Sequence, residues 1–377
     1  MRFQVERDTL ADAVGWAARA LPARPAAPIL AGMHLTAAGQ DLTLSTFDYE
    51  VSAQASVPVV TDSEGSVLVP GRLLAEIVKA LPPRPVEVAM DGARVTVKCG
   101  ASAFTLNTLP DDEYPALPSM PPVAGKIGAD LLASAIQQVA VAAGRDDTLP
   151  ALTGIRVEID GDTLTLVATD RYRLAIRELQ HWEPAVAGTK AAVLVPARAL
   201  AEAAKSFGTA AEVTIGLDAH GEVASGGTGI IGWEAGGRQT TTRLLGGEYV
   251  KYAALLPSEF TAVAELPVAP FAEAVKRVAL VAERNTPVRL TFTDGALLLE
   301  AGAGDEAMAA ETVDAMYHED EDLKVCFNPA YLLDGLGAID SDTARISFTT
   351  PTRPAVLTGK DGDQDYRYVL MPIRSAG

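Results

Sequence analysis

The chain repeats one pattern of segments three times, and this repetition limits what it can fold into more than any other feature. The segment 67–80, VLVPGRLLAEIVKA, returns at 193–206 as VLVPARALAEAAKS and more weakly at 325–336 as VCFNPAYLLDGL. The offsets between the copies are 126 and 132 residues. Copies that recur at this spacing and in the same order predict three versions of one structural unit, each the size of a small domain.

Other elements recur in step with that segment. Similar helical segments begin near Leu10, Leu132 and Phe271, and an apolar strand pattern at 42–48 returns at 164–170. Apolar residues at helical spacing predict helices in the repeated segments, and alternation with period two predicts short half-buried strands between them. Each unit therefore has two helices among many strands. We predict an α+β fold in which the helices cover one face of an antiparallel sheet.

Proline-rich stretches mark the borders of the three units. Prolines cluster at 115–122 and again near Pro257. Such segments are stiff and should limit how far neighbouring units swing. We therefore predict three domains, at residues 1–120, 121–256 and 257–377.

The composition indicates a folded cytoplasmic protein. Hydrophobic residues make up 48% of the 377 residues, and no apolar run reaches the length of a transmembrane helix or a signal-peptide core. Cys99 and Cys326 lie far apart in strand-like runs, where buried reduced thiols are expected. The net charge of −18 argues against a protein that grips nucleic acid with its whole surface. A DNA-binding protein this acidic must gather its cations on one face or encircle the duplex.

The sequence offers no recognisable catalytic or cofactor site. Its four histidines are not at metal-ligand spacing from one another, and it contains neither a Walker motif nor a nucleophile elbow. The glycine-rich run 225–232 is expected to be a loop, and the acidic run 318–322 a solvated turn. We therefore expect no cofactor, no metal and no reaction.

Basic residues repeat on one helix face. Arg72, Glu76 and Lys79 lie opposite the apolar stripe of their helix. The second copy repeats the same face with Arg198, Glu202 and Lys205. The pattern is compatible with an exposed face that carries ion pairs, and equally with a functional basic surface. The third copy lacks it, and Lys276, Arg277 and Arg284 can compensate there.

Three segments, at 24–30, 168–175 and 368–374, closely resemble the β sliding clamp of bacterial DNA polymerase III, and the likeness spans all three units. The run 145–154 resembles the clamps of high-GC Gram-positive bacteria. The resemblance implies a processivity factor without activity of its own, in which two crescent-shaped chains close head to tail into a ring around duplex DNA. A clamp-loader ATPase would open the ring. The replicative polymerase alpha subunit, repair polymerases, ligase and mismatch-repair proteins would compete for a peptide pocket between units 2 and 3.

The resemblance also assigns residues to these contacts. The DNA-facing candidates are Arg24, Arg72, Lys79, Arg145, Arg198, Lys205, Lys276 and Arg277. The candidates for the dimer interface are Phe104 and Leu106 on one subunit, with Leu280 and Val281 on the other. The pocket candidates are Leu152, Thr153, Thr169, Arg171, Tyr172, Leu174, Val250, Leu255, Pro354, Val369, Met371, Pro372, Ile373 and Arg374.

Two positions depart from the family pattern. Val250 stands where the family usually has proline, and the tail 375–377 runs slightly past the usual end. Because proline would fix the backbone at the rim of the pocket, we hypothesise a variant clamp whose pocket handles some ligand differently. A rival interpretation is a repeat-built interaction scaffold that never encircles DNA. An enzyme ranks third, since no site supports it.

Overall fold

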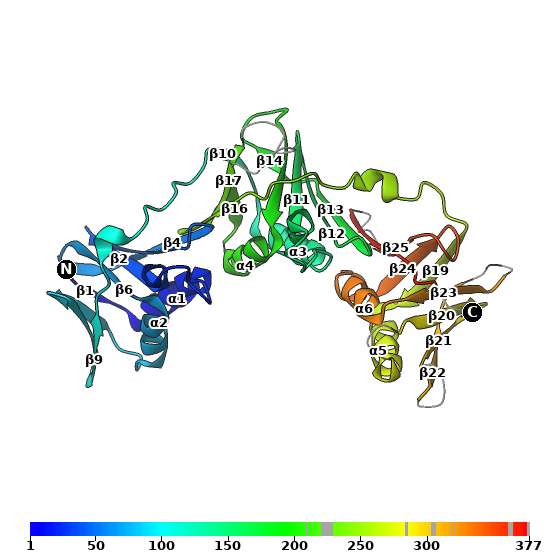
Figure 1. Ribbon diagram of the computed structural model, residues 1–377, viewed down its shortest axis with the longest axis horizontal. Coiled ribbons are helices and arrows are strands. Elements are labelled where there is room, and N and C mark those ends of the chain that lie inside the picture. Colours follow the sequence, from blue (N-terminus) through cyan, green and yellow to red (C-terminus); the bar gives the residue numbers. More distant parts are fainter. Residues whose placement is uncertain are drawn as a thin grey trace.

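Three units follow one another along an arc, with the helices on its concave side (Figure 1). The computed structural model describes residues 1–208, 210–219, 229–282, 286–302, 307–317, 319, 321–360 and 365–374. The predictions made for 225–228, His318, Asp320, Arg284 and the tail 375–377 lie outside the described residues. The rest of the run 225–232 was predicted to be a loop, and this is wrong: residues 229–232 begin strand β17 (Gly229–Ala235), because backbone hydrogen bonds pair them with a strand on each side.

Unit 1 holds two helices and nine strands. It is joined to unit 2 by a linker that Tyr114 anchors, since its hydroxyl accepts a hydrogen bond from Phe47 N at 2.7 Å. The elements of unit 1 are β1 (Arg2–Val5), α1 (Arg7–Ala17), β2 (Gly32–Ala38), β3 (Asp41–Phe47), β4 (Val51–Pro58), β5 (Val60–Ser63), β6 (Gly65–Pro70), α2 (Gly71–Ala80), β7 (Val86–Asp91), β8 (Arg94–Cys99) and β9 (Ser102–Asn107).

Unit 2 repeats this order of elements. Its second helix follows Pro196 as α2 follows Pro70, so the recurring VLVP segments are a strand that leads directly into a helix. The elements of unit 2 are β10 (Val123–Gly128), α3 (Ala129–Ala140), β11 (Gly154–Asp160), β12 (Thr163–Thr169), β13 (Arg173–Leu179), β14 (Glu183–Pro184), β15 (Lys190–Pro196), α4 (Ala197–Phe207), β16 (Glu212–Ala219), β17 (Gly229–Ala235) and β18 (Arg238–Arg243).

Unit 3 has the same plan. Its second helix begins at Pro329, and the side chain of Asn328 caps it by accepting hydrogen bonds from the amides of Ala330 and Tyr331. The elements of unit 3 are β19 (Ala262–Pro267), α5 (Val268–Val278), β20 (Val288–Thr293), β21 (Ala296–Ala301), β22 (Ala309–Asp314), β23 (Leu323–Phe327), α6 (Pro329–Gly337), β24 (Thr343–Phe348), β25 (Ala355–Gly359) and β26 (Tyr366–Leu370).

The sheets cross the borders between units. In the described residues, a nine-stranded sheet joins β4 of unit 1 to β18 of unit 2, and an eight-stranded sheet joins β13 of unit 2 to β26 of unit 3. A five-stranded sheet ends at β9 in unit 1, and a four-stranded sheet ends at β22 in unit 3. Every pairing between these strands is antiparallel. Backbone hydrogen bonds therefore tie the three units into one continuous structure.

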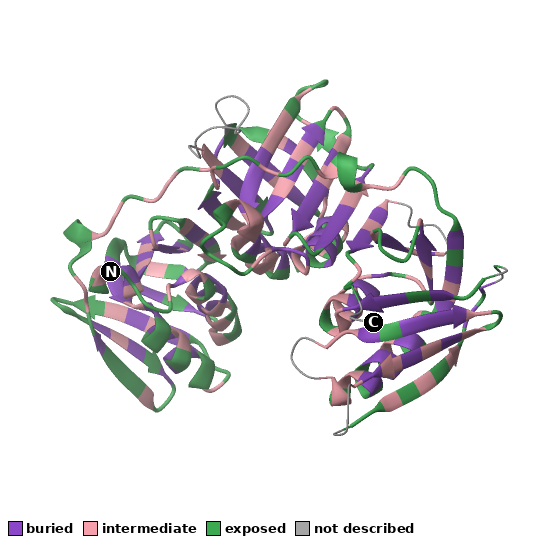
Figure 2. Cartoon of the chain, turned by 45° about the vertical axis from the view of Figure 1, so that its right-hand side comes forward, coloured by how far each residue is buried: buried purple, intermediate pink, exposed green. Residues whose placement is uncertain are grey.

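The α+β class is confirmed, but the expectation of one sheet per unit is wrong. Each unit contributes strands to two sheets. In unit 2 the first helix packs against both: α3 contacts β10 and β16 of the nine-stranded sheet and β12 and β13 of the eight-stranded one. Figure 2 shows the buried residues between the helices and the strands of each unit.

The hydrophobic cores are not evenly divided. Most buried hydrophobic residues of units 2 and 3 form one contiguous cluster, and a small second cluster of Val167, Leu174, Ile176, Val356 and Val369 lies at their junction. Those of unit 1 form a separate cluster. Cys99 and Cys326 are both buried and free, as predicted. Units 2 and 3 are therefore packed together more completely than units 1 and 2.

Candidate functional site

The junction between units 2 and 3 collects most of the predicted pocket residues. Strands β13 and β26 pair there, with Leu174 opposite Val369, and the pairing continues where Met371 N donates to Tyr172 O at 2.9 Å. Leu174 and Val369 are 2% and 3% exposed. These two side chains therefore form the buried floor of the junction rather than a surface that a ligand can touch directly.

A tight turn between β12 and β13 shapes the rim of this junction. Asp170 Oδ1 accepts hydrogen bonds from the amides of Tyr172 and Arg173, and Thr169 Oγ1 accepts one from Arg171 N at 3.1 Å. Arg171 consequently adopts a φ of 80°, in the left-handed region that side-chain-bearing residues rarely occupy. The turn holds the exposed Arg171 and Tyr172 side chains beside the junction.

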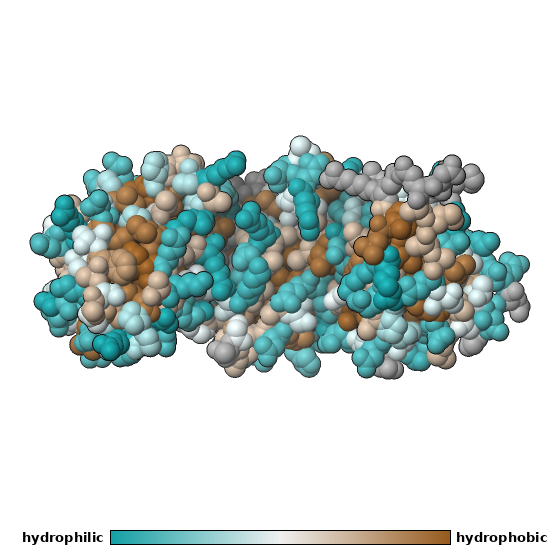
Figure 3. All heavy atoms as spheres, turned by 90° about the horizontal axis from the view of Figure 1, so that it is seen from below, coloured by the Kyte–Doolittle hydropathy of each residue, from teal (hydrophilic) through white to brown (hydrophobic). Residues whose placement is uncertain are grey.

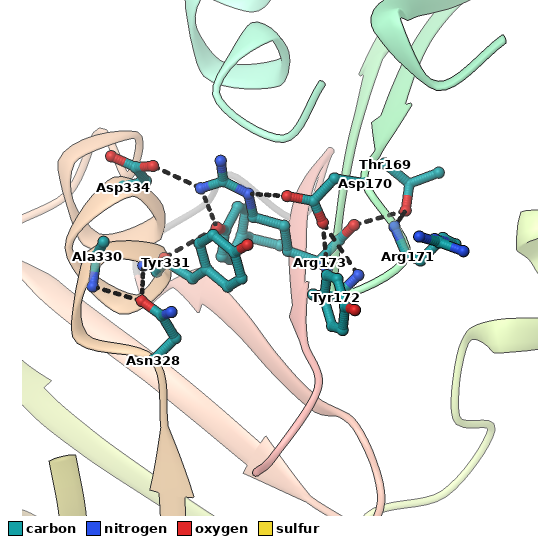
Figure 4. Close-up of polar contacts among 10 residues, drawn as sticks. Thr169, Asp170, Arg171, Tyr172, Arg173, Asn328, Ala330, Tyr331 and Asp334 are labelled. Carbon is teal, nitrogen blue, oxygen red and sulfur yellow. Dashed lines mark hydrogen bonds and ion pairs between the residues drawn. The ribbon is translucent and has the colours of Figure 1, made fainter. Parts of the chain in front are cut away.

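Arg173 is the centre of a buried polar cluster that spans the two units (Figure 4). Its guanidinium donates to Asp170 Oδ2 at 3.0 Å, to Asp334 Oδ2 at 2.5 Å and to the hydroxyl of Tyr368 at 3.3 Å. It also lies 4.3 Å from the ring centroid of Tyr331. Burial opposes the charge, but Tyr368 and the two carboxylates outweigh that effect and keep the pKa of Arg173 above its usual value. The guanidinium therefore remains charged and links β13 to α6.

Two tyrosines border a hollow beside that cluster. Tyr172 is 56% exposed and stacks on Tyr331, with ring centroids 6.4 Å apart. The hollow has a volume of about 670 Å³, and Leu152 and Arg171 also line it. A large exposed aromatic ring beside charged and apolar groups is suited to anchoring a peptide side chain.

The linker between units 2 and 3 forms a second side of the site. Tyr249 donates from its hydroxyl to Val167 O at 3.3 Å, and Tyr252 donates to Glu158 Oε2 at 2.7 Å. Burial raises the pKa of both tyrosines, so both stay protonated as donors. Between these two anchors, Val250 is 38% exposed at a hollow of about 560 Å³.

The segment after β26 forms the third side. Ile373 N donates to Cys326 O at 2.8 Å, which holds this segment against β23. Met371 and Ile373 remain 44% and 37% exposed, and Ile373 and Arg374 line a hollow of about 380 Å³. Of these three hollows, the one beside Tyr172 is lined by both units, the one at Val250 by unit 2 and its linker, and the one at Ile373 by unit 3. The predicted pocket residues are thus divided among three hollows and do not line a single cavity.

The sequence prediction missed several residues of this site. Asp170, Arg173, Tyr331 and Asp334 were not predicted, although the first two lie within the motif 168–175 that carried the resemblance. Charged residues directly after a buried strand signal such a cluster. Among the predicted residues, Thr169 is buried in the turn, Thr153 donates to Pro150 O at 2.8 Å, and Pro354 and Leu255 lie at the edges, Leu255 with half of its side chain exposed.

The predicted DNA-facing residues are all exposed and lie on the helices or the loops beside them. Figure 3 shows the concave side, where hydrophilic residues are interspersed with apolar patches. Three of the eight bind carboxylates of their own unit: Lys205 with Glu202 at 2.6 Å, Lys276 with Glu273 at 2.7 Å and Arg277 with Glu311 at 2.5 Å. Arg72 donates to Leu21 O. Within the described chain, the remaining four, Arg24, Lys79, Arg145 and Arg198, have no ion pair.

The two ends of the arc carry exposed apolar side chains at the free sheet edges. Phe104 on β9 is 38% exposed, and Leu280, just after α5, is 84% exposed. Val281 is partly buried, and Leu106 is 2% exposed within the core of unit 1. Leu106 therefore supports strand β9 from inside and does not present a surface to a partner.

No group of three or more His, Cys, Asp or Glu side chains in the ranges described is placed to hold a metal ion.

In that same part of the chain, no helix is long and apolar enough to span a membrane.

Comparison with known proteins gives consistent matches along the chain. Three family models match in order: the N-terminal domain of the DNA polymerase III beta subunit at residues 1–118, its central domain at 126–251 and its C-terminal domain at 253–374. The beta sliding clamp of Streptomyces coelicolor is 56% identical, over 100% of both chains. A protein of Streptomyces muensis named beta sliding clamp homolog GriR is 47% identical over 99% of each. The solved Pseudomonas aeruginosa clamp bound to griselimycin has a TM-score of 0.90 and 28% identity, over 100% of both chains.

Proposed function

The chain belongs to the bacterial DNA polymerase III beta subunit family, the beta sliding clamps, and we propose that two copies of it close into a ring around duplex DNA. As a member of that family it is a non-catalytic accessory subunit of the polymerase holoenzyme. The ring closure, the DNA contacts and the binding partners are our proposals. They rest on the unpaired edges of β9 and β22, on the exposed cations of the concave side, and on the groove at the junction of units 2 and 3, whose rim carries Tyr172, Val250 and Met371.

The free edges carry the proposal of a closed ring. Within each unit the strand orders correspond, so β9 holds the place of β18 and β26, while β22 holds the place of β4 and β13. The two internal junctions pair β18 with β4 and β26 with β13. By the same rule, β9 of one copy would pair with β22 of a second. The joined sheet would have nine strands, as many as the sheet between units 1 and 2, and the free edges of β9 and β22 would both be paired.

The charge distribution supports enclosure rather than tight binding. The protein carries a net charge of −18, so its surface as a whole repels DNA. The exposed cations on the concave side, five of them without ion pairs in the described chain, can make weak contacts with phosphates of any sequence. Such contacts would centre a duplex and still let the ring slide.

The groove between units 2 and 3 fits short peptides from other replication and repair proteins. Its rim presents exposed aromatic and apolar side chains over a rigid buried floor, which is the arrangement that peptide anchoring requires. We propose the replicative polymerase alpha subunit, the clamp-loader ATPase, repair polymerases, ligase and mismatch-repair proteins as partners. The site of action would be the cytoplasm.

Retention on circular DNA tests the ring directly. The protein would be placed on nicked circular DNA with a cognate loader and ATP, and then separated by gel filtration before and after the circle is cut. We expect retention that disappears when the circle is linearised, because a ring that only encircles the DNA can slide off a free end. Retention that survives cutting would support ordinary binding by a scaffold, and our proposal would be abandoned.

We also propose that the groove is a variant one. Val250 at the linker hollow supports this, and so does the similarity to a chain named as a clamp homolog. The backbone N–H of Val250 makes no hydrogen bond within the described residues, so replacement by proline would remove no backbone hydrogen bond. A difference in peptide or inhibitor affinity between the protein and its Val250→Pro variant is the expected result.

A further inference from the structure

A second cavity lies at the junction between units 1 and 2. It has a volume of about 590 Å³ and is bounded by the end of α1, the β3–β4 turn, the start of α4 and strand β18. Trp16, Pro22, Val51 and Ala53 give it an apolar wall. A cavity of this size accommodates one or two side chains of a ligand.

This cavity is the counterpart of the hollow between units 2 and 3. The β3–β4 turn repeats the β12–β13 turn: Asp48 Oδ1 accepts from the amides of Glu50 and Val51, and Tyr49 has a φ of 75°. Strand β4 then pairs with β18 as β13 pairs with β26. The backbone therefore has the same turn and the same strand pairing at both junctions.

The two junctions differ in the side chains at equivalent positions of this backbone. The repeat alignment places Val51 at the position of Arg173, and Ala199 at the position of Tyr331. The strand registers place Thr240, opposite Ala53, where Tyr368 lies opposite Ala175. Three large side chains that pack the junction of units 2 and 3 are thus replaced by small ones. The space they would occupy is open between units 1 and 2, in agreement with the separate core of unit 1.

The charges around the cavity favour an anionic ligand. Arg19, Arg24 and Arg198 all line it, and none of them has an ion pair within the described chain. Three acidic residues also line it. Glu202 is bound to Lys205 at 2.6 Å and Asp48 holds the turn, whereas Glu50 is exposed and has no ion pair within the described chain. Three free guanidinium groups therefore stand against one free carboxylate. Unpaired guanidinium groups are strong donors to carboxylates, especially beside an apolar wall that excludes water.

We infer that this cavity is a second peptide-binding site, which takes a short acidic segment of a partner protein with one bulky apolar side chain. The apolar side chain fills the space left by the small residues, and the flanking carboxylates bind the arginines. Duplex DNA fits less well because its bases are stacked, so it would use the arginines and leave the apolar cavity empty. The inference does not require that the groove between units 2 and 3 be occupied.

Calorimetric titration of the full-length protein with the capped peptide DDLFD tests the inference, with the capped peptide KKLFK as the charge control. We expect DDLFD to bind and KKLFK to bind at least tenfold more weakly. Ala199→Tyr, which copies the side chain found at the other junction, should weaken DDLFD at least tenfold by filling the cavity. Arg198→Glu should weaken it similarly, whereas Lys98→Glu, an equal charge change on exposed strand β8, should not.

Several outcomes would overturn the inference. These are absence of DDLFD binding, equal binding of KKLFK, or binding that Ala199→Tyr and Arg198→Glu leave unchanged. Binding lost only in Tyr172→Ala would place the peptide in the groove between units 2 and 3. If Arg198→Glu lost retention on circular DNA but still bound DDLFD normally, the arginines would serve DNA instead. If Ala199→Tyr failed to fold, the affinities of Arg198→Glu and Lys98→Glu for DDLFD would still show whether the peptide binds at this cavity.

Discussion

Replacing Arg173 with methionine should loosen the junction between units 2 and 3 without unfolding either unit. Arg173 is 5% exposed and holds Asp170, Asp334 and Tyr368 together. Methionine keeps most of the side-chain volume but removes the charge and every hydrogen bond donor. The change therefore isolates the polar cluster from the apolar packing around it.

The magnitude follows from the exposure of the partners. A hydrogen bond to a charged group contributes about 1.5–3 kcal/mol when it is buried. The Asp170 side chain is 15% exposed and retains that range, whereas Asp334 is 41% exposed, so solvent screens most of its contribution. The stacking on Tyr331 adds about 0.5–1 kcal/mol. We therefore expect a loss of about 2–3 kcal/mol in the free energy of opening this junction.

Native-state hydrogen exchange of the β26 amides measures this quantity, because those amides are protected by pairing with β13. A loss of about 2–3 kcal/mol corresponds to about 30- to 150-fold faster exchange. Arg345→Met is the matched control, since Arg345 makes an ion pair with Glu265 in the same sheet but is 40% exposed. Exchange in Arg173→Met that stays within twofold of the parent, or an equal effect of the control, would refute the reasoning.

Three further predictions concern dimerisation through the ends of the arc, the pH dependence of stability and the peptide affinity of the groove between units 2 and 3. Leu280→Ala should weaken dimerisation about tenfold to hundredfold in sedimentation experiments, because burying a leucine contributes about 1.5–3 kcal/mol. Val186→Ala, a change of an exposed residue on unit 2, should have no effect on dimerisation. A normal dimer in Leu280→Ala would contradict the proposed dimer interface. Hydrogen bonds from Lys360 and a neighbouring arginine hold the pKa of Glu265 below its usual value, so its stabilisation is present above about pH 4.3 and is lost as the pH falls through the lowered pKa. The Glu265→Gln variant should therefore melt below the parent at pH 7 and converge with it in acid; a constant difference down to pH 3 would argue against this ion pair. Val250→Pro should change the affinity of a clamp-motif peptide, and unchanged affinity would mean that the groove is not a variant one.

The sequence predicted local structure well because the relevant signals are local. Apolar residues at helical spacing placed the second helix near Leu74, and α2 lies there; the VLVP segments end in strands that lead into helices, as their recurrence indicated. The division of each unit between two sheets was not predictable in this way. Whether β4 pairs with β18 or with another strand depends on contacts between segments far apart in the chain, which side-chain periodicity does not report.

The site was predicted in part for a similar reason. Tyr172 and Met371 were identified through the resemblance, and both border the junction with exposed side chains. Arg173 was missed because an arginine in a short turn is expected to face solvent. Its burial depends on Asp334, which is 161 positions away, on helix α6 of unit 3. The cavity between units 1 and 2 could not be foreseen either, since it results from small residues on three separate elements, β4, α4 and β18.

The sheet that crosses from unit 2 to unit 3 also affects how the protein is made on the ribosome. Arg173 on β13 and its partner Tyr368 on β26 are separated by 195 residues. At a synthesis rate of about 5–20 residues per second, β13 waits on the order of 10–40 s for the strand that covers it. During that interval the nascent chain exposes an unpaired strand beside an apolar floor, which is a template for association with neighbouring nascent chains. Chaperones that shield emerging polypeptides should therefore raise the yield of this protein, most of all when many ribosomes translate one message.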